Sequence, residues 1–394
     1  MSQNSKLFLL ITMGLLSAFG PFVTDFYLPA LPTITKFFGT SVSMVQLSLT
    51  SSMFGLAVGQ LILGPLSDKF GRKPIIIASL LTYLLATILC IFSPEIKVFI
   101  FARLIQGFAA SGGVVISKSV AADLFKNREL TKFFSLLMIV NGIAPIASPV
   151  LGGFLIGITT WQGIFWALFL IGVILLILNL NLIESNPAHL RFKGKFWSAF
   201  KNFGPILKNK QFMNYVFAQT FAMGFLFSYI ASSPFIFQEH YHLTPVQFSI
   251  CFGLNALGIM VGSSLVSFFK SEKTALKTGG ICLIALSLVL GSVLYSEGSI
   301  FLLECIFILL TISLGLILPT TSALGLNLVH ENNGSASAIL GFLPFLMGSV
   351  VSPLVGIGNI VYSTLLSIII CCLISVFFIF RSIRNDSSTY KRII

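Results

Sequence analysis

The side chains best suited to chemistry in this sequence are two charges that stand inside long apolar stretches. Asp25 is the only acid in an apolar run over residues 7–34, and Arg103 lies in another run over residues 98–122. An ionised carboxylate removed from water is costly, so such a group can take up a proton and carry it. Arginine stays charged, so Arg103 could influence a nearby acid or hold an anionic group. We expect both residues to face one cavity; the alternative is that each reaches water at the outer boundary of its helix.

A short motif between two apolar runs offers a second kind of chemistry, a set of charges that can form and break ion pairs. The stretch over residues 64–74 has the spacing G-x-x-x-D-x-x-G-R-K. Its glycines permit a tight turn between closely packed helices, and its acid and guanidinium can pair with charges on neighbouring helices. We expect a conformational latch here, with an ordinary basic loop as the alternative; its residues are Gly64, Asp68, Gly71, Arg72 and Lys73.

Two further groups of residues suit a helix bundle that changes shape around a ligand. Proline removes a helical hydrogen bond and glycine allows close backbone approach, so their clustering predicts a helix that bends, although static membrane bundles share this composition. The residues of this motif are Pro145, Pro149, Gly152 and Gly153. Aromatic and small polar side chains on inward faces would contact a small-molecule substrate, and we expect these to be Tyr27, Asn141, Gln219 and Tyr229.

The composition indicates what surrounds these residues. The chain of 394 residues is 56% hydrophobic and only 9% charged, whereas soluble domains are about 25% charged. Lipid must therefore solvate most of the chain, and each helix that crosses it needs about 20 mostly apolar residues. Twelve segments meet this length: 7–34, 42–66, 75–93, 98–122, 131–157, 161–183, 211–238, 246–270, 275–295, 299–328, 333–358 and 360–381.

One long hydrophilic stretch, residues 184–210, divides the twelve segments into six and six. We expect an N-terminal bundle over 1–183 and a C-terminal bundle over 211–394. The basic amphipathic linker between them would lie on anionic lipid, or would simply be solvated. On the side of the linker and the termini fall 20 Lys and Arg residues, against 2 on the other side. This asymmetry places both termini in the cytoplasm and the chain in the inner, or plasma, membrane.

The sequence also disfavours several classes of function. Its net charge of +12 is spread over short clusters, so we expect contact with anionic lipid and none with nucleic acid. All six cysteines fall in apolar runs, and the stretch Glu239–His242 suits a hydrated loop end better than a metal site. There is no phosphate loop of the G-x-x-x-x-G-K-[ST] type. We expect no enzymatic activity, no metal and no cofactor other than protons as the coupling ion.

In these motifs the sequence resembles the major facilitator superfamily, and within it the twelve-helix drug:proton antiporters of the Bcr/CflA (bicyclomycin/chloramphenicol resistance) family. The segments that carry the resemblance are 24–32 (TDFYLPALP), 64–74, 103–107 (RLIQG), 144–153 and 334–343. It implies an all-α membrane protein, a monomer, with twelve transmembrane helices in two pseudo-symmetric six-helix bundles. It also implies that Arg103 takes part in proton coupling and that Asp123 partners Arg72 in the latch.

Four further residues need interpretation: two depart from the family pattern, and two are charges within or near the end of an apolar run. Ser148 replaces a glycine that is usual in the family, which is expected to loosen the packing of the fifth helix. Pro344 replaces a polar residue, which weakens any transfer of family substrate contacts to the eleventh helix. Lys118 lies near the end of the fourth segment, where its ammonium can reach water. Glu304 is the only other acid well inside an apolar run, and an interfacial position would also explain it.

Together these observations predict proton-coupled efflux of small amphipathic molecules such as drugs. Two bundles would rock about a central site, and the latch would hold the outward-open state until the cytoplasmic side opens. One alternative is the export of a specific metabolite, such as a nucleoside, sugar or amino-acid derivative. The other is a membrane sensor or enzyme without transport, which would need an intramembrane catalytic cluster or an appended signalling domain.

Overall fold

In the residues described by the computed structural model, all the regular structure is helical. The structure describes residues 5–125, 127–187, 189, 191, 203–295, 298–329 and 333–390. Each of the twelve apolar segments expected from the sequence falls largely within helix, which confirms the all-α architecture. Within the described residues, ten helices are long and apolar enough to cross a membrane; two shorter apolar stretches, Ile143–Ile158 and Ala338–Leu354, lie in α6 (Asn127–Ile158) and α13 (Asn333–Leu354).

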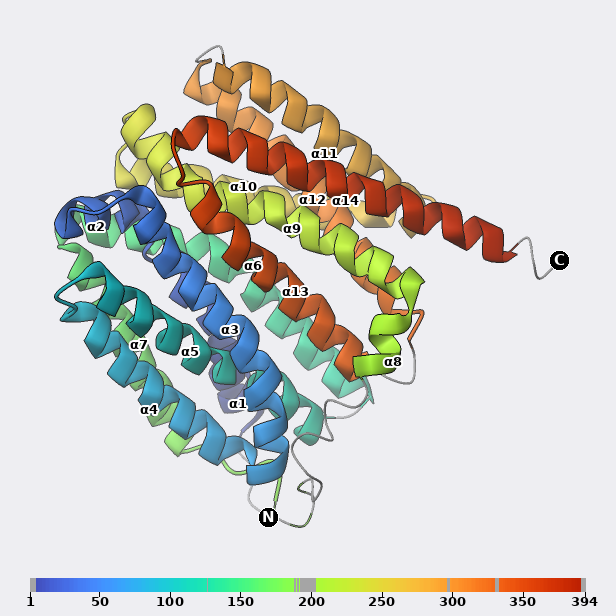
Figure 1. Ribbon diagram of the computed structural model, residues 1–394. Helices are drawn as coiled ribbons and strands as arrows, with labels where there is room; N and C mark the ends of the chain where they lie inside the picture. The colour runs from blue at the N-terminus through green and yellow to red at the C-terminus, as the bar shows by residue number, and fades with distance from the viewer. Residues whose placement is uncertain are drawn as a thin grey trace. The chain divides into compact units, whose positions relative to one another are not determined.

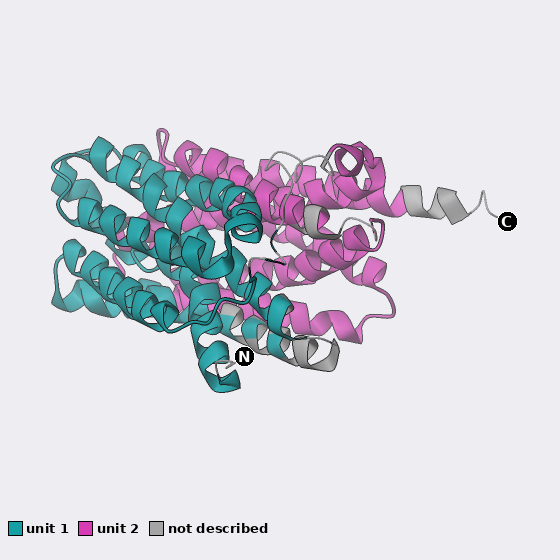
Figure 2. Cartoon of the chain, turned by 90° about the horizontal axis from the view of Figure 1, so that it is seen from below, with its two compact units in different colours: residues 1–199, 244–249 teal, residues 200–243, 250–394 magenta. Residues whose placement is uncertain are grey.

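The chain divides into two compact units, which Figure 2 colours separately. Unit 1 comprises residues 1–199 and 244–249, and unit 2 comprises residues 200–243 and 250–394. Besides α6, the helices of unit 1 are α1 (Lys6–Asp25), α2 (Leu31–Phe38), α3 (Val42–Phe70), α4 (Arg72–Ile91), α5 (Ile96–Leu124) and α7 (Trp161–Leu180). Besides α13, those of unit 2 are α8 (Phe203–Lys208), α9 (Lys210–Phe235), α10 (Pro245–Leu265, with its first turn in unit 1), α11 (Glu272–Tyr295), α12 (Ile300–Leu326) and α14 (Ile360–Tyr390), as Figure 1 shows.

The first apolar segment is broken rather than continuous. α1 ends at Asp25, a short 3₁₀ turn, η1 (Leu28–Ala30), follows, and α2 carries the chain on to Phe38. Pro29 has no amide hydrogen, and its ring would clash with the preceding turn of an α-helix, so the regular helix cannot pass through it. Asp25 therefore stands in the last turn of α1, beside backbone whose helical hydrogen bonding is interrupted.

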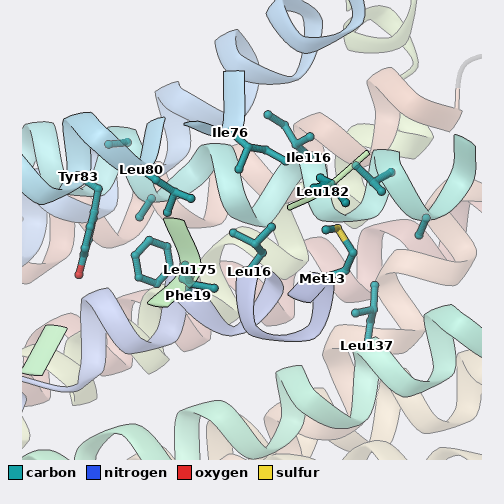
Figure 3. Close-up of a cluster of buried hydrophobic side chains, with 14 of the residues drawn as sticks. Met13, Leu16, Phe19, Ile76, Leu80, Tyr83, Ile116, Leu137, Leu175 and Leu182 are labelled. Atoms are coloured by element: carbon teal, nitrogen blue, oxygen red, sulfur yellow. The ribbon is translucent and has the colours of Figure 1, made fainter. Parts of the chain in front are cut away.

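The core of unit 1 is a cluster of buried apolar side chains between its helices. Figure 3 shows Leu16 and Phe19 of α1 gathered with Ile76 and Leu80 of α4 and with Leu175 of α7. Lipid tails are as apolar as these side chains, so exclusion of water adds little to helix association inside a membrane. Close packing must hold the helices in place, and it fixes α1 against the helices that carry the polar residues.

The outward faces of the helices are apolar as well. Leu85 is 69% exposed, Phe101 57% and Ile158 80%. In water such a surface would favour aggregation, whereas hydrocarbon solvates it. The exposed apolar residues therefore agree with a chain that lies in the membrane.

Glycine pairs at i and i+4 bring one pair of helices close together in each unit. An added Cβ at Gly55 or Gly59 of α3 would collide with the backbone of α5. An added Cβ at Gly262 of α10 would likewise collide with the backbone of α12, and one at Gly258 would meet Thr311. Such small-x-x-x-small patterns are a common device for close helix packing in membranes. α3 is thereby held on α5, and α10 on α12.

Candidate functional site

Arg103 lies in the interior of unit 1, where its side chain is fully buried. The Nη2 atom donates a hydrogen bond to the carbonyl oxygen of Val23 at 2.8 Å, and Nη1 donates to Oε1 of Gln106. The guanidinium carbon lies 4.2 Å from the centre of the Tyr27 ring. The cation is thus held at the C-terminal end of α1, where the helix dipole is negative, and over an aromatic face that attracts positive charge.

The neighbours of Arg103 are neutral. Among the described residues no acid forms an ion pair with it, and its Nε has no hydrogen-bond partner. The Tyr27 hydroxyl lies 3.2 Å from Oγ of Ser48 on α3, and Nε2 of Gln106 donates to Oγ1 of Thr87 on α4 at 2.8 Å. A buried cation that rests only on dipoles can stabilise a negative charge that arrives or develops beside it.

Asp25 is buried two residues beyond Val23, whose carbonyl oxygen binds Arg103. In the described part of the chain no hydrogen bond or ion pair joins the Asp25 carboxylate to the Arg103 guanidinium. The structure therefore places the two charges at the same end of α1 without joining them directly. That they communicate through one cavity stays a prediction.

At the turn between α3 and α4, the Arg72 guanidinium binds two acids. Its Nε donates to Oδ2 of Asp123 on α5 at 2.9 Å, and its Nη2 reaches Oδ1 of the same carboxylate at 3.4 Å. Its Nη1 donates to the Asp68 carboxylate and, at 2.7 Å, to Oγ of Ser67. The Asp123 side chain is 24% exposed and that of Asp68 51%. The pair with Asp123 is the better shielded of the two.

Glu184, which follows α7, extends this network and was not predicted from the sequence. Its Oε1 accepts a hydrogen bond from the backbone amide of Arg72 at 2.9 Å, and its Oε2 accepts from that of Lys73 at 3.1 Å. These amides belong to the first turn of α4, where N–H groups lack helical partners and a negative charge is favoured. Glu184 is the only acid in residues 184–210. That isolated acid in a basic stretch is the signal that could have identified it.

The two residues after Glu184 bind the same network. Ser185 Oγ donates to Oδ2 of Asp123 at 2.9 Å, and Nδ2 of Asn186 donates to the carbonyl oxygen of Asp68 at 3.1 Å. The start of the predicted linker thus packs on the turn between α3 and α4. Three of the six basic residues on which the membrane-surface interpretation depended, Lys193, Lys195 and Lys201, lie outside the described residues.

The remaining latch residues have other neighbours. Gly71 has a φ of +106°, a backbone conformation that is strained for any residue with a side chain, and an added Cβ would also displace the Glu184 carboxylate, 2.7 Å away. Lys73 Nζ donates to the carbonyl oxygen of Leu180 at 2.8 Å, at the C-terminal end of α7, where a cation is favoured. Gly64 lies against α5, since a Cβ there would be 3.5 Å from a methyl group of Val115.

The proline and glycine motif of α6 packs closely on its neighbours. A Cβ at Gly152 would collide with the carbonyl oxygen of Phe26, and one at Gly153 would lie 2.9 Å from that of Pro245, in the turn of α10 that belongs to unit 1. Pro145 and Pro149 both lie inside the continuous α6.

Ser148 lies between the two prolines and fastens α6 to α1. It is fully buried, and its hydroxyl donates to the carbonyl oxygen of Pro21 at 3.2 Å. The expectation that a serine here loosens the packing of the fifth helix is therefore wrong, because the added hydroxyl supplies a hydrogen bond between helices.

Two of the predicted substrate contacts lie in unit 2. Oε1 of Gln219 accepts a hydrogen bond from Oγ of Ser322 on α12 at 3.0 Å. Tyr229 on α9 is joined through Asn255 of α10 to Glu304 of α12: Nδ2 of Asn255 lies 3.0 Å from the Tyr229 hydroxyl and 2.9 Å from Oε1 of Glu304. Asn255 was not singled out from the sequence. The side chain of Asn141, also predicted to contact substrate, is outside the described part.

A family model described as Major Facilitator Superfamily matches residues 12–353. The chain belongs to the major facilitator superfamily. An uncharacterised MFS-type transporter, YdgK of Bacillus subtilis, is 39% identical over 90% of both chains. A bicyclomycin resistance protein homolog of Haemophilus influenzae is 31% identical over 68% of each. The chloramphenicol resistance protein CraA of Acinetobacter baumannii is 29% identical over 73% of this chain and 70% of its own. These relatives confirm the resemblance drawn from the motifs.

Solved structures of major facilitator proteins share the fold. A bacterial homolog of the lysosomal transporter Spinster matches with a TM-score of 0.75 at 14% identity over 97% of this chain and 98% of its own. The xylose transporter XylE of E. coli matches with a TM-score of 0.74 at 13% identity over 95% and 97%. The protein is thus a multi-pass membrane transporter with the major facilitator fold and not an enzyme.

Proposed function

We propose that this major facilitator protein exports small drug-like molecules in exchange for protons across the bacterial inner membrane. The observation that carries the proposal is that two buried ionisable residues, Asp25 and Arg103, meet the same end of α1 without forming an ion pair with each other. A transporter driven by protons needs a carboxylate that can be both neutral and ionised inside the membrane. It also needs a group that stabilises the ionised form, and a fixed guanidinium beside the carboxylate can do so.

In this mechanism Asp25 binds a proton when its pocket is open to the outside and releases it when the pocket is open to the cytoplasm. Arg103 stabilises the ionised carboxylate left behind. Drug and proton are exchanged because the drug-bound and the drug-free protein favour different protonation states of Asp25. The break between α1 and α2 allows the backbone around Asp25 to adjust during this change, since few helical hydrogen bonds must be broken there.

The latch supplies the conformational step. The Arg72 guanidinium, its two acids and the Glu184 cap together hold α3, α4, α5 and the end of α7. Such a set of charges is stable only while its helices keep their relative positions. We assign it to the cytoplasmic side, with both termini in the cytoplasm and the basic residues on anionic lipid. It would close that side in the outward-open state, in a monomeric protein with no cofactor other than protons.

The names of the relatives support the choice of substrate class. Members of this group are named for resistance to bicyclomycin, to chloramphenicol and to multiple drugs. Neutral amphipathic antibiotics of this kind are therefore the first substrates to test. The aromatic and amide side chains of Tyr27, Gln219 and Tyr229 suit such ligands because they offer hydrogen bonds and ring faces without a fixed charge.

Everted membrane vesicles that contain the protein test the proposal. Uptake of radiolabelled chloramphenicol should rise when a proton gradient, acid inside, is imposed, and should collapse when an ionophore dissipates the gradient. Vesicles with the Glu239→Gln variant, which changes an exposed acid, serve as the matched control. Drug uptake that ignores the gradient would refute proton antiport and leave the family and fold intact.

A further inference from the structure

Unit 2 contains a second buried acid that the mechanism above does not use. Glu304 lies in the second turn of α12 and is 8% exposed. Its Oε1 accepts a hydrogen bond from Nδ2 of Asn255, which is itself 1% exposed. Its Oε2 is buried and has no hydrogen-bond partner within the described part of the chain. In the described residues no lysine, arginine or histidine forms an ion pair with this carboxylate.

The groups that face Glu304 are neutral. The titratable ones are the Tyr229 phenol of α9 and the Cys251 thiol of α10. An ionised carboxylate buried without a cation is strongly disfavoured, because the medium cannot replace the water it has lost. One hydrogen bond from an amide offsets only part of that loss. In this closed arrangement Glu304 therefore holds a proton, and it can lose that proton only if the pocket opens to water.

Asn255 is suited to both states of the acid. Its Nδ2 has two hydrogens and lies within 3.0 Å of three acceptors, the Tyr229 hydroxyl, the Cys251 carbonyl oxygen and Oε1 of Glu304. Its Oδ1 has no partner among the residues that the structure describes. With Nδ2 towards Glu304, as in the structure, it donates to Oε1, which accepts whether the acid is ionised or carries its proton on Oε2. A half-turn of the amide places Oδ1 there, and that oxygen can accept the hydroxyl hydrogen of a neutral Glu304. An apolar neighbour would offer neither contact.

We propose that Glu304, with Asn255 and Tyr229, forms a second proton-binding site in unit 2, separate from Asp25, so that each drug molecule is exchanged for two protons. The proton binds one carboxylate oxygen as Glu304 becomes neutral, and it leaves as a hydrated proton when the pocket opens. This inference rests on proton antiport as the proposed function, but its first test does not require transport.

Infrared spectroscopy of the purified full-length protein reports carboxyl protonation directly. In a pH titration, the carbonyl stretch of neutral carboxylic acids should contain one component that Glu304→Gln removes and another that Asp25→Asn removes. The exposed-acid control Glu239→Gln should lose neither. Replacing the amide by an apolar group of similar size, Asn255→Leu, should keep the Glu304 component present to higher pH. A titration in which Glu304→Gln matches the wild type would overturn the inference, whatever happens to Asp25.

The number of protons is counted in proteoliposomes with chloramphenicol, an uncharged probe. Net drug flux stops when the drug gradient balances the proton-motive force multiplied by the number of protons exchanged. Each proton contributes a tenfold drug gradient for every ~59 mV. At an imposed force of about 120 mV the balancing ratio should be about 10⁴ for the wild type and about 10² for Glu304→Gln. Equal ratios in the two proteins would show that Glu304 carries no proton, whereas no drug movement in any protein would refute the proposed function.

Discussion

The two units place a polar pocket on corresponding helices, but one is built around a fixed cation and the other around an acid. In unit 1 the pocket uses α1, α3 and α5, and it holds Arg103 beside Tyr27, whose hydroxyl reaches Ser48. In unit 2 the pocket uses α9, α10 and α12, and it holds Glu304 beside Asn255, which reaches Tyr229. These are the first, second and fourth long helices of each unit. One scaffold thus supports a fixed cation in one unit and an acid that can be neutralised in the other.

The turns between the second and third long helices differ more. Unit 1 has the Arg72 network and the Glu184 cap at the start of α4. In unit 2 the corresponding stretch, residues 266–277, contains no glycine, and α11 begins with the exposed Glu272. Close helix packing is therefore common to both units, whereas the described network of breakable ion pairs belongs to unit 1. We infer that control of opening is concentrated there.

The largest effect should come from the cation of unit 1. Arg103→Lys keeps a positive charge but loses the planar fork that binds Val23 and Gln106 and stacks on Tyr27. We expect proton-driven chloramphenicol transport to fall by about 5- to 150-fold, the usual range of coupling between two sites. Arg381→Lys, at an exposed residue of α14, is the control. Wild-type transport in Arg103→Lys would mean that transport requires the positive charge at this position but not the planar geometry of the guanidinium.

The two acids of the latch should rank by their exposure. Asp123→Asn removes a shielded charge-assisted hydrogen bond to Arg72 and should destabilise the protein by about 1.5–3 kcal/mol. Asp68→Asn removes a pair whose acid is half exposed and should change stability by about 0–1 kcal/mol. Thermal unfolding of the purified variants in detergent gives the order. If Asp68→Asn were the more harmful change, the exposed pair and not the shielded one would hold the turn.

Glu184 binds the first turn of α4 in unit 1, and Glu272 lies in the first turn of α11 in unit 2, so the two acids can be compared between the units. Glu184→Gln leaves one acceptor for the two amides of α4 and removes the charge at the helix terminus. It should cost about 0.5–2 kcal/mol, as loss of a helix cap does. Glu272→Gln, at an exposed first turn, should cost at most about 1 kcal/mol. Equal melting temperatures for the two variants would contradict the placement of Glu184 in the latch.

The smallest effects should come from the two tyrosines. Tyr27→Phe loses the hydroxyl that meets Ser48 but keeps the ring under Arg103. Tyr229→Phe loses one acceptor of Asn255 and keeps the ring. Each should change stability by about 0.5–1.5 kcal/mol, the net value of one hydrogen bond. A rise in the KM for chloramphenicol without a matching fall in melting temperature would instead show that the hydroxyl contacts the drug.

Most of the fold could be predicted from the sequence because the membrane simplifies the problem. A helix that crosses lipid must satisfy every backbone group within itself, so apolar length alone identifies it. The partnership of Arg72 with Asp123 was implied by the family resemblance, whereas its contact with Asp68 was not predicted. The break after Asp25 could not be predicted from the sequence alone, because Pro29 and Pro32 are compatible both with a bent helix and with two helices.

The partners that the sequence did not reveal are distant in the chain and ordinary in type. Glu184 binds an amide 112 residues away, and Asn255 is a single amide in an apolar run that meets Glu304 49 residues later. Such contacts depend on which helix faces which, and hydrophobic periodicity does not report that for helices that are apolar on all sides. Ser148 was misjudged for the same reason, since its acceptor belongs to another helix.

The most direct test of proton carriage by Asp25 compares two transport modes of Asp25→Asn in proteoliposomes. Asparagine is close to a permanently neutral aspartic acid, so the variant should still exchange labelled for unlabelled chloramphenicol across the membrane. Its accumulation of the drug under an imposed proton gradient should fall far below that of the wild type, because only the proton proposed at Glu304 remains to drive it. Gradient-driven accumulation at the wild-type level in Asp25→Asn would contradict the account.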